Sequence, residues 1–224
     1  MMTMELTRSF CCRELKKLDV VDSKDKKIGK ITDFTFTFDG NLRLSQFILA
    51  GPRLEEFLEA IRVIPDKDPL FNASFIEKFG NKIHLSTTVD NLKTTLDDEA
   101  IPEGEIRLTK LEKLDIFDKD GVKVGRTIDV DFDVDGSAWL TVGGSFFEEK
   151  LEAIGLREDI DIIVPTNVIE SIGDDVRLLV TKDNLGTTMD EILKNKSADL
   201  RRMRTDAETR RDIAKVRLHA LRPV

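Results

Sequence analysis

Apolar and polar residues alternate along residues 33–40, DFTFTFDG, which place a phenylalanine at every second position. Such alternation predicts a β-strand with the aromatic side chains on one face. The closing Asp-Gly pair is typical of a hairpin turn, because glycine accepts the positive φ that the turn requires. Apolar alternation resumes at Leu42 and Leu44. The segment therefore predicts two antiparallel strands joined by a tight turn.

A helical period appears once in this region. LEEFLEAI at 54–61 has apolar residues at positions i, i+3, i+4 and i+7, namely Leu54, Phe57, Leu58 and Ile61. This spacing gives one apolar stripe and predicts a short helix in an otherwise stranded segment.

The whole pattern occurs twice. KLDVVDSKDKKIGKITDFTFTFDG at 17–40 matches KLDIFDKDGVKVGRTIDVDFDVDG at 113–136 at an offset of 96 residues, from 17 to 113. LEEFLEAI then matches FEEKLEAI at 147–154 at an offset of 93, from 54 to 147. We therefore expect three residues to be missing from the second copy between its hairpin and its LEAI segment. Copies of roughly 90 residues suit small domains better than solenoid repeats. The predicted domains are 5–99 and 106–189, followed by a tail at 190–224.

The tail predicts a long helix. Residues 190–222 contain neither glycine nor proline and are rich in Arg, Leu, Met and Ala. Leu200 belongs to a set of apolar residues spaced seven apart, and Met203 lies beside this seam, whereas Arg210 interrupts the second apolar position that a coiled coil needs. Two interpretations stay open: a helix that docks or forms a homo-oligomer through these residues, and a solvated basic extension.

Charge separates the tail from the body. The chain has 35 Lys and Arg against 43 Asp and Glu, a net charge of -8. Residues 190–224 hold ten basic and six acidic residues, which leaves +4 in the tail and -12 in the rest. An acidic body is a poor ligand for a phosphate backbone, so nucleic acid is not expected as its partner. No apolar run approaches the roughly 20 residues of a membrane span, and the first residues do not resemble a signal peptide, so we expect a cytoplasmic protein.

The succession of motifs resembles a known family. LDV-x-D, then KIG or KVG, then a strand closing on DG, and IIVPTNVIESIGDDVRLLV at 162–180 are similar to the PRC-barrel domain. The resemblance covers nearly all of residues 10–182 in two copies. It implies a mainly β fold: two tandem small antiparallel β-barrels, each with a short helix, followed by a C-terminal helix. The resemblance also implies protein-interaction modules without catalytic residues in common.

Catalytic residues are not expected elsewhere either. A nucleophilic site needs a nucleophile, a base and an orienting group together. Cys11 and Cys12 are adjacent, far from His84 in sequence, and His84 aligns with Arg177 of the second copy. We expect two reduced thiols near the first strand, an ordinary strand histidine, no cofactor and no enzyme activity.

DVDFDVDG at 129–136 resembles the front of a calcium loop. Alignment with such a loop places Asp131, Asp133 and Asp135 at positions one, three and five, but position twelve is Val142 instead of a bidentate glutamate. The first copy has threonines at two of the aspartate positions. We therefore predict no metal site, and an outward acidic strand face on which Asp131 and Asp133 are available to a partner.

Trp139 is the single tryptophan of the chain. Alternation places it on the face opposite Ala138 and Leu140, and the offset of 96 makes Arg43 its counterpart. Two interpretations stay open: Trp139 packs within the protein, or it anchors a partner.

Taken together, these features favour a non-catalytic adaptor that binds protein partners and scaffolds a cytoplasmic complex, such as an archaeal-type cell-division assembly. The alternative is a ribosome-associated or RNA-maturation factor, by resemblance to the C-terminal domain of the ribosome maturation factor. The basic tail permits this alternative, but its arginines lack the interleaved aromatic residues that stack on bases.

Overall fold

The computed structural model describes residues 5–6, 9–51, 69–92, 101–132, 137–144, 160–185 and 215–218, with the backbone alone at 5–6, 160–162 and 215–218. The chain divides into two compact units, one made of Met1–Leu111 with Asp129–Ala138 and the other of Glu112–Ile128 with Trp139–Val224. The fold is mainly β, as the sequence predicts. Among the described helices, none is both long and apolar enough to span a membrane.

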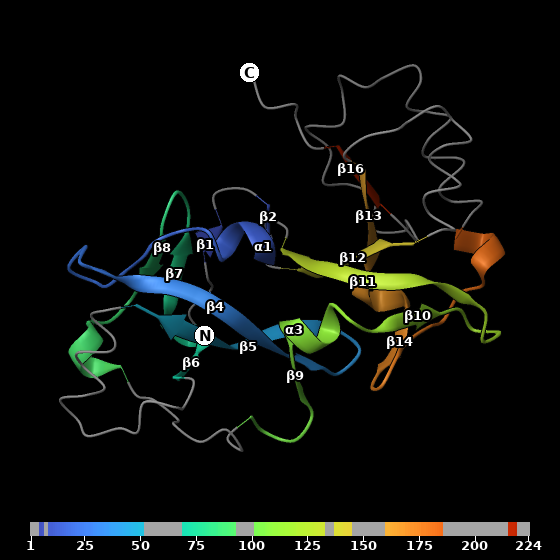
Figure 1. Cartoon of the computed structure of the whole chain (residues 1–224), viewed down its shortest axis with the longest axis horizontal. Coiled ribbons are helices and arrows are strands. Elements are labelled where there is room, and N and C mark those ends of the chain that lie inside the picture. The colour runs from blue at the N-terminus through green and yellow to red at the C-terminus, as the bar shows by residue number, and fades with distance from the viewer. Residues whose placement is uncertain are drawn as a thin grey trace. The chain divides into compact units, whose positions relative to one another are not determined.

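The first sheet has the strand order β1-β7-β8-β3-β4-β5-β6, and β9 pairs with β4 (Figure 1). Its strands are β1 (Glu5–Leu6), β3 (Val20–Val21), β4 (Lys27–Phe38), β5 (Leu42–Ala50), β6 (Leu70–Asn72), β7 (Ile76–Phe79), β8 (Ile83–Leu85) and β9 (Glu105–Arg107). Its short helices are α1 (Cys12–Leu15), η1 (Ala73–Phe75), η2 (Val89–Asn91) and α3 (Leu108–Leu111).

The second sheet has the order β14-β15-β10-β11-β12-β13-β16, and β2 pairs with β11. Its strands are β2 (Phe10–Cys11), β10 (Asp115–Phe117), β11 (Lys123–Phe132), β12 (Ala138–Gly143), β13 (Ile160–Pro165), β14 (Ile169–Ile172), β15 (Val176–Leu178) and β16 (Lys215–Leu218). Its short helix is η3 (Thr166–Val168), and residues 182–185 form a further helical turn.

Strand pairing confirms the internal repeat. β3 pairs in parallel with β8 through Val20 and Ile83, and β10 pairs in parallel with β15 through Ile116 and Val176. Val20 and Ile116 are 96 residues apart and Ile83 and Val176 are 93 residues apart, which are the two offsets found in the sequence. Both copies therefore bring the same two segments together.

The three-residue gap lies inside the hairpin, so its predicted place after the hairpin is wrong. Gln46 of β5 faces Asn72 of β6, and Trp139 of β12 faces Pro165 of β13, with an offset of 93 on both sides. β5 has nine residues and β12 has six. The counterpart of Trp139 is therefore Gln46 and not Arg43. Backbone pairing reveals this because the short, variable turn has few letters to align.

The phenylalanine alternation of residues 33–40 is confirmed in β4. Phe34 and Phe36 are fully buried and Phe38 is partly exposed. Thr35, between them, is buried as well, so the middle of β4 is covered on both faces. Phe132 of β11 stacks near Phe36, with ring centroids 6.2 Å apart. Aromatic side chains bury large areas, and here residues of both sequence copies share the core of the first unit.

The structure describes only a small part of the segments predicted to be helical. Residues 54–61 and 147–154 lie outside the described residues. In the tail, Lys215–Leu218 form β16, which runs antiparallel to β13, so the helix predicted there is wrong for these four residues. Without β16, β13 would be an edge strand with unpaired backbone groups, and the alternating sequence Lys-Val-Arg-Leu suits a strand that pairs with it. Leu200, Met203 and Arg210 lie outside the described residues.

One glycine pair sets how closely two strands approach. Gly29 of β4 lies against Gly51 at the end of β5: a Cβ added to Gly51 would be 2.6 Å from the Cα of Gly29, and a Cβ added to Gly29 would clash with the backbone oxygen of Ala50. The second copy has the same arrangement, because a Cβ on Gly144 would be 3.0 Å from the Cα of Gly125. Only glycine permits this approach.

We predict that Gly29→Ala lowers the free energy of unfolding of the first unit by about 2–4 kcal/mol, since the clash is with backbone and no rotamer relieves it. Denaturant unfolding followed by circular dichroism measures the loss. Gly80→Ala is the matched control, because a Cβ there meets only the oxygen of Lys82 at 3.8 Å. Equal stability of the two variants would contradict this account of Gly29.

Candidate functional site

The first unit contains a reciprocal exchange of strands between the two sequence copies. β9, from the start of the second copy, pairs with β4 through Ile106 and Phe36. β2, from the start of the first copy, pairs with the end of β11 through Phe10 and Phe132. The four residues are related pairwise by the offset of 96. Each copy thus supplies a short strand that pairs with the long strand of the other copy.

A buried aspartate closes each exchange. Asp33 Oδ2 accepts a hydrogen bond of 2.8 Å from the Thr109 hydroxyl at the start of α3. The equivalent Asp129 accepts one of 3.1 Å at Oδ2 from the backbone N–H of Arg13 in α1. Each carboxylate also accepts from the N–H of the next residue of its own strand, Phe34 or Val130. The aspartates therefore fix the short helices onto the long strands.

Glu105, the first residue of β9, fixes this strand to β4 and β5 through its carboxylate. The Thr35 hydroxyl donates to Glu105 Oε2 at 2.6 Å, and the Ser45 hydroxyl donates to Oε1 at 2.5 Å. The Gln46 amide adds a third hydrogen bond of 3.1 Å. A carboxylate that accepts several charge-assisted hydrogen bonds is held in one orientation. The interaction is structural, since all three donors are side chains of the same sheet.

The two cysteines lie in this region and are free thiols, as the sequence predicts. Burial, together with the negative charge of Asp129, raises the pKa of Cys11 to about 12 and raises the pKa of Cys12 well above its ordinary value. A thiolate is the reactive form of cysteine. Both thiols therefore stay protonated and unreactive at neutral pH.

The predicted outward acidic face is wrong at Asp129 and Asp131. Both side chains are buried, and Asp131 is only 1% exposed. The reason is the strand exchange, because β2 pairs beside this end of β11, with Cys11 facing Asp131, and brings α1 against Asp129. Asp133 lies outside the described residues, together with the turn that completes the calcium-like motif. In the ranges that the structure describes, no group of three or more His, Cys, Asp or Glu residues could hold a metal ion.

Asp129 is a buried carboxyl whose pKa is raised. Burial raises its pKa from 3.8 to about 6, although the N–H groups of Val130 and Arg13 and the Cys11 thiol partly offset this effect by hydrogen bonding. The nearby Asp131 charge raises the pKa further. Asp129 therefore takes up a proton in the folded protein at a pH at which an exposed aspartate is ionised.

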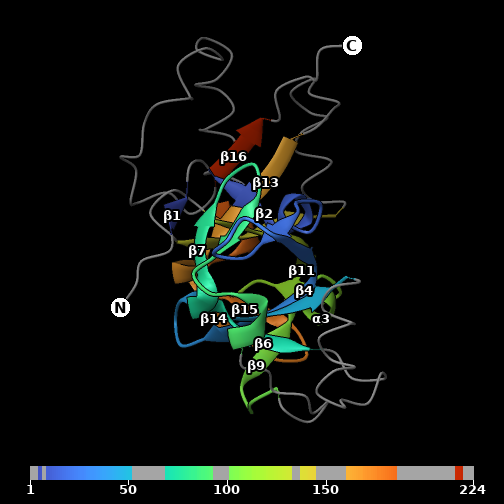
Figure 2. The ribbon, with the colours of Figure 1, turned by 90° about the vertical axis from the view of Figure 1, so that its left-hand side faces the viewer.

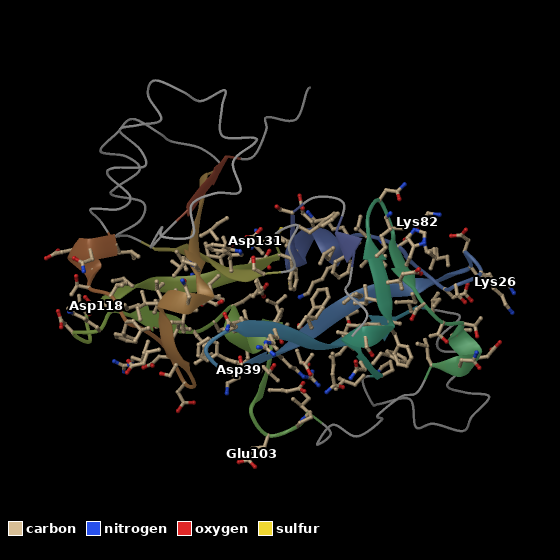
Figure 3. All side chains as sticks on the ribbon, turned by 180° about the vertical axis from the view of Figure 1, so that it is seen from behind. Lys26, Asp39, Lys82, Glu103, Asp118 and Asp131 are labelled. Atoms are coloured by element: carbon tan, nitrogen blue, oxygen red, sulfur yellow. The ribbon has the colours of Figure 1, made fainter. Side chains whose placement is uncertain are left out.

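In the second unit, a buried aspartate, Asp118, organises the turn between β10 and β11 (labelled in Figure 3). Asp118 Oδ1 accepts from the N–H groups of Asp120 at 3.0 Å and Val122 at 2.7 Å, and Oδ2 accepts from Lys182 N–H at 2.8 Å. Burial alone would raise the pKa of Asp118, but the three donors together lower it. The turn is thereby fixed to the segment that follows β15.

Two apolar side chains are exposed in this part of the second unit: Val122 in the turn and Leu179 directly after β15. Val122 is 46% exposed and Leu179 is 53% exposed, and they are the two exposed large hydrophobic residues in the described part of the chain. A hydrogen bond of 3.1 Å from Lys119 N–H to the Val180 carbonyl joins their two segments. We call Val122 and Leu179 the apolar pair.

The first copy is polar at the positions of the apolar pair. Lys26 is the counterpart of Val122 at the offset of 96, and Ser86 is the counterpart of Leu179 at the offset of 93. The turns themselves are equivalent, since Asp22 Oδ1 accepts from the N–H groups of Lys24 and Lys26 at 2.9 Å each. Sequence reasoning missed the apolar pair, although comparing the two copies position by position would have found it.

A cation lies beside this turn. The Arg177 guanidinium is 4.8 Å from the centroid of the Phe117 ring and donates to Asp175 from Nε at 2.8 Å. The counterpart of Arg177 is His84, whose Nδ1 is 3.7 Å from Asp25 Oδ1. The two copies thus carry different side chains on the same backbone framework.

Trp139 is partly exposed and lies between the buried residues Ala138 and Leu140, as the predicted alternation requires, but Thr141, on the same side of β12 as Trp139, is buried. Whether Trp139 serves a partner or only packs within the protein stays a prediction.

We expect Asp129→Asn to remove a pH dependence of stability. Because the folded pKa of about 6 exceeds 3.8, the folded state binds a proton that the unfolded state releases. Stability from this group is therefore greatest below pH 4 and falls by about 3 kcal/mol as the pH rises to 7. Denaturant unfolding at pH 4, 5, 6 and 7 measures the difference between wild type and variant. Parallel profiles for the two proteins would refute the assignment.

Thiol labelling should be slow in the native protein. Cys11 and Cys12 are buried and protonated, so we expect an aromatic disulfide reagent to react with them only at the rate of unfolding. A Ser23→Cys variant supplies an exposed thiol as the control for reagent activity. Rapid native labelling of two thiols in the wild type would show that this burial is incorrect.

Comparison with known proteins agrees with this architecture. Residues 8–90 match the PRC-barrel domain family. No curated protein matches the chain. The PRC-barrel domain is a small β-barrel module that often takes part in protein interactions. The matched range contains β2 to β8, and β10 to β15 repeat the pairing of β3 to β8. Residues 8–90 therefore belong to the PRC-barrel domain family, and a second barrel-like β unit with the same strand pairing follows them.

Proposed function

We propose that this chain is a non-catalytic adaptor that binds a protein partner through the apolar pair, Val122 and Leu179. The exposure of two large apolar side chains on two segments that are hydrogen-bonded to each other is the observation that carries the proposal. Fully burying one such side chain against a partner contributes about 1.5–3 kcal/mol. Hot spots of protein interfaces are anchors of this kind, surrounded by polar residues.

The surroundings of the apolar pair support a docking role. The Asp118 carboxylate fixes the turn through three N–H groups, so binding costs little ordering of the backbone. Arg177, which is paired with Asp175 and lies on the Phe117 ring, adds a guanidinium group at the same end of the unit. Arginine and aromatic residues are enriched in interfaces. A protein surface with apolar and acidic groups would complement this combination.

The difference between the two copies supports an adaptor over a simple duplication. The first copy carries Lys26 and Ser86 where the second carries the apolar pair. Two units with the same framework and different surfaces suit two different partners. The complex that we favour is a cytoplasmic assembly such as the archaeal-type cell-division machinery, on the family resemblance alone.

Several features support a function without catalysis. Burial keeps both thiols protonated, and Glu105 and Asp33 are engaged by hydrogen-bond donors of the sheet. His84 lies in β8 beside Asp25. None of these groups has the depressed thiol pKa or the open, poised base of a nucleophilic site.

The apolar pair is tested by affinity capture from the native cell. We expect the Val122→Asp/Leu179→Asp chain to lose at least one protein that the wild type retains, because two charges replace the apolar contact. Lys26→Glu/Ser86→Asp changes the equivalent positions of the first copy and should keep that protein. Circular dichroism checks folding of both variants. Identical retained proteins for all three chains would rule out this surface.

A further inference from the structure

β16 is a strand whose position depends on a single neighbour. It pairs with β13, at the end of the second sheet, and the register joins Ile160 to Leu218 and Ile163 to Lys215 (Figure 2). The described part of the chain gives it no other strand partner. Four residues of pairing are few, since strands in globular proteins usually have about 5–6 residues.

The local sequence of β16 does not require a strand. Residues 190–222 contain no glycine or proline and favour helix by composition. The strand at Lys215–Leu218 therefore reflects the backbone donors and acceptors that the β13 edge supplies. Because the local preference of these residues is helical, their strand conformation depends on the pairing with β13. β16 can leave β13 at a small cost in free energy.

The covalent link does not confine β16 to its own chain. Residues 186–214, which number 29, connect the helical turn at 182–185 to β16. A chain of this length reaches at most roughly 100 Å. The same strand can therefore reach the β13 edge of another molecule.

Register adds a specific complement between donor and acceptor. Asp161 of β13 and Arg217 of β16 occupy facing positions, and Ile162 faces Val216. Opposite charges and β-branched residues at facing positions favour pairing over other registers. Every copy carries both the acceptor edge and the strand that fits it, which is the condition for a symmetric exchange.

We infer that the β13 edge is a strand-acceptor site whose partner is a second copy of this chain, which inserts its own Lys215–Leu218 strand in place of β16. Two chains then exchange their C-terminal strands reciprocally. This self-association does not rest on the adaptor function, because the apolar pair lies on a different part of the unit, in the turn between β10 and β11 and directly after β15.

Disulfide trapping between full-length chains tests the exchange. One chain carries Asp161→Cys, and a second, made heavier by a tag, carries Arg217→Cys. Facing strand residues have Cα atoms about 4.5–5.5 Å apart, within the range of a disulfide. We expect the mixed chains, under mild oxidation, to give a heterodimer on a non-reducing gel in roughly tenfold excess over collision background. The native thiols contribute little, since burial keeps them protonated.

Two controls separate exchange from collision. Asp120→Cys, an exposed thiol in the turn after β10, replaces Asp161→Cys and sets the background. Lys215→Pro/Val216→Pro, added to the Arg217→Cys chain, removes a backbone donor that faces β13, because successive strand residues direct their N–H groups to opposite sides. The heterodimer should fall to background in both mixtures.

A single chain with both Asp161→Cys and Arg217→Cys reports the pairing within one molecule. Its internal disulfide would confirm the register. If that disulfide forms but the mixed single variants give only background, the second copy is excluded as the partner. Failure of the internal disulfide as well would overturn the strand-acceptor site itself. Neither result changes the outcome of the affinity capture with the apolar-pair variant.

Discussion

The first unit depends on the exchange of β2 and β9 between the two sequence copies. Each short strand completes a long strand of the other copy, and Asp33 and Asp129 then fix the helical turns that follow. Phe132 enters the same core beside Phe36. Because these contacts are reciprocal, the first compact unit takes in the start of the second copy and residues 129–138. Duplication has therefore produced two interdependent copies, since neither long strand is complete without the other copy.

The shared framework also explains how the two copies differ. The paired glycines, the aspartate turns and the strand registers recur, because each serves the backbone. Side chains that point outward from these turns do not recur, as Val122 against Lys26 shows. A surface position can change without a cost in stability when it makes no contact in the fold. Function is accordingly to be sought where the two copies diverge.

Burying carboxylates destabilises this arrangement, because a buried carboxylate loses its hydration. Asp129 loses water and raises its pKa to about 6, with only local N–H and S–H donors as compensation. The equivalent Asp33 has the Thr109 hydroxyl, and Lys16 lies 3.8 Å away. The two sites thus fix similar helical turns with unequal compensation of the buried charge.

The sequence by itself determined the repeat, the strands and the alternation along them, as in Phe34 and Phe36, because these follow from local periodicity. Tertiary structure decided the rest. Alternation shows which residues share a face but not what packs against them, so the burial of Asp131, whose strand pairs with β2, followed only from long-range pairing. The place of the three-residue gap needed the register of β12 and β13. The strand at Lys215–Leu218 could be recognised only from its pairing with β13, which outweighs the helical preference of residues 215–218.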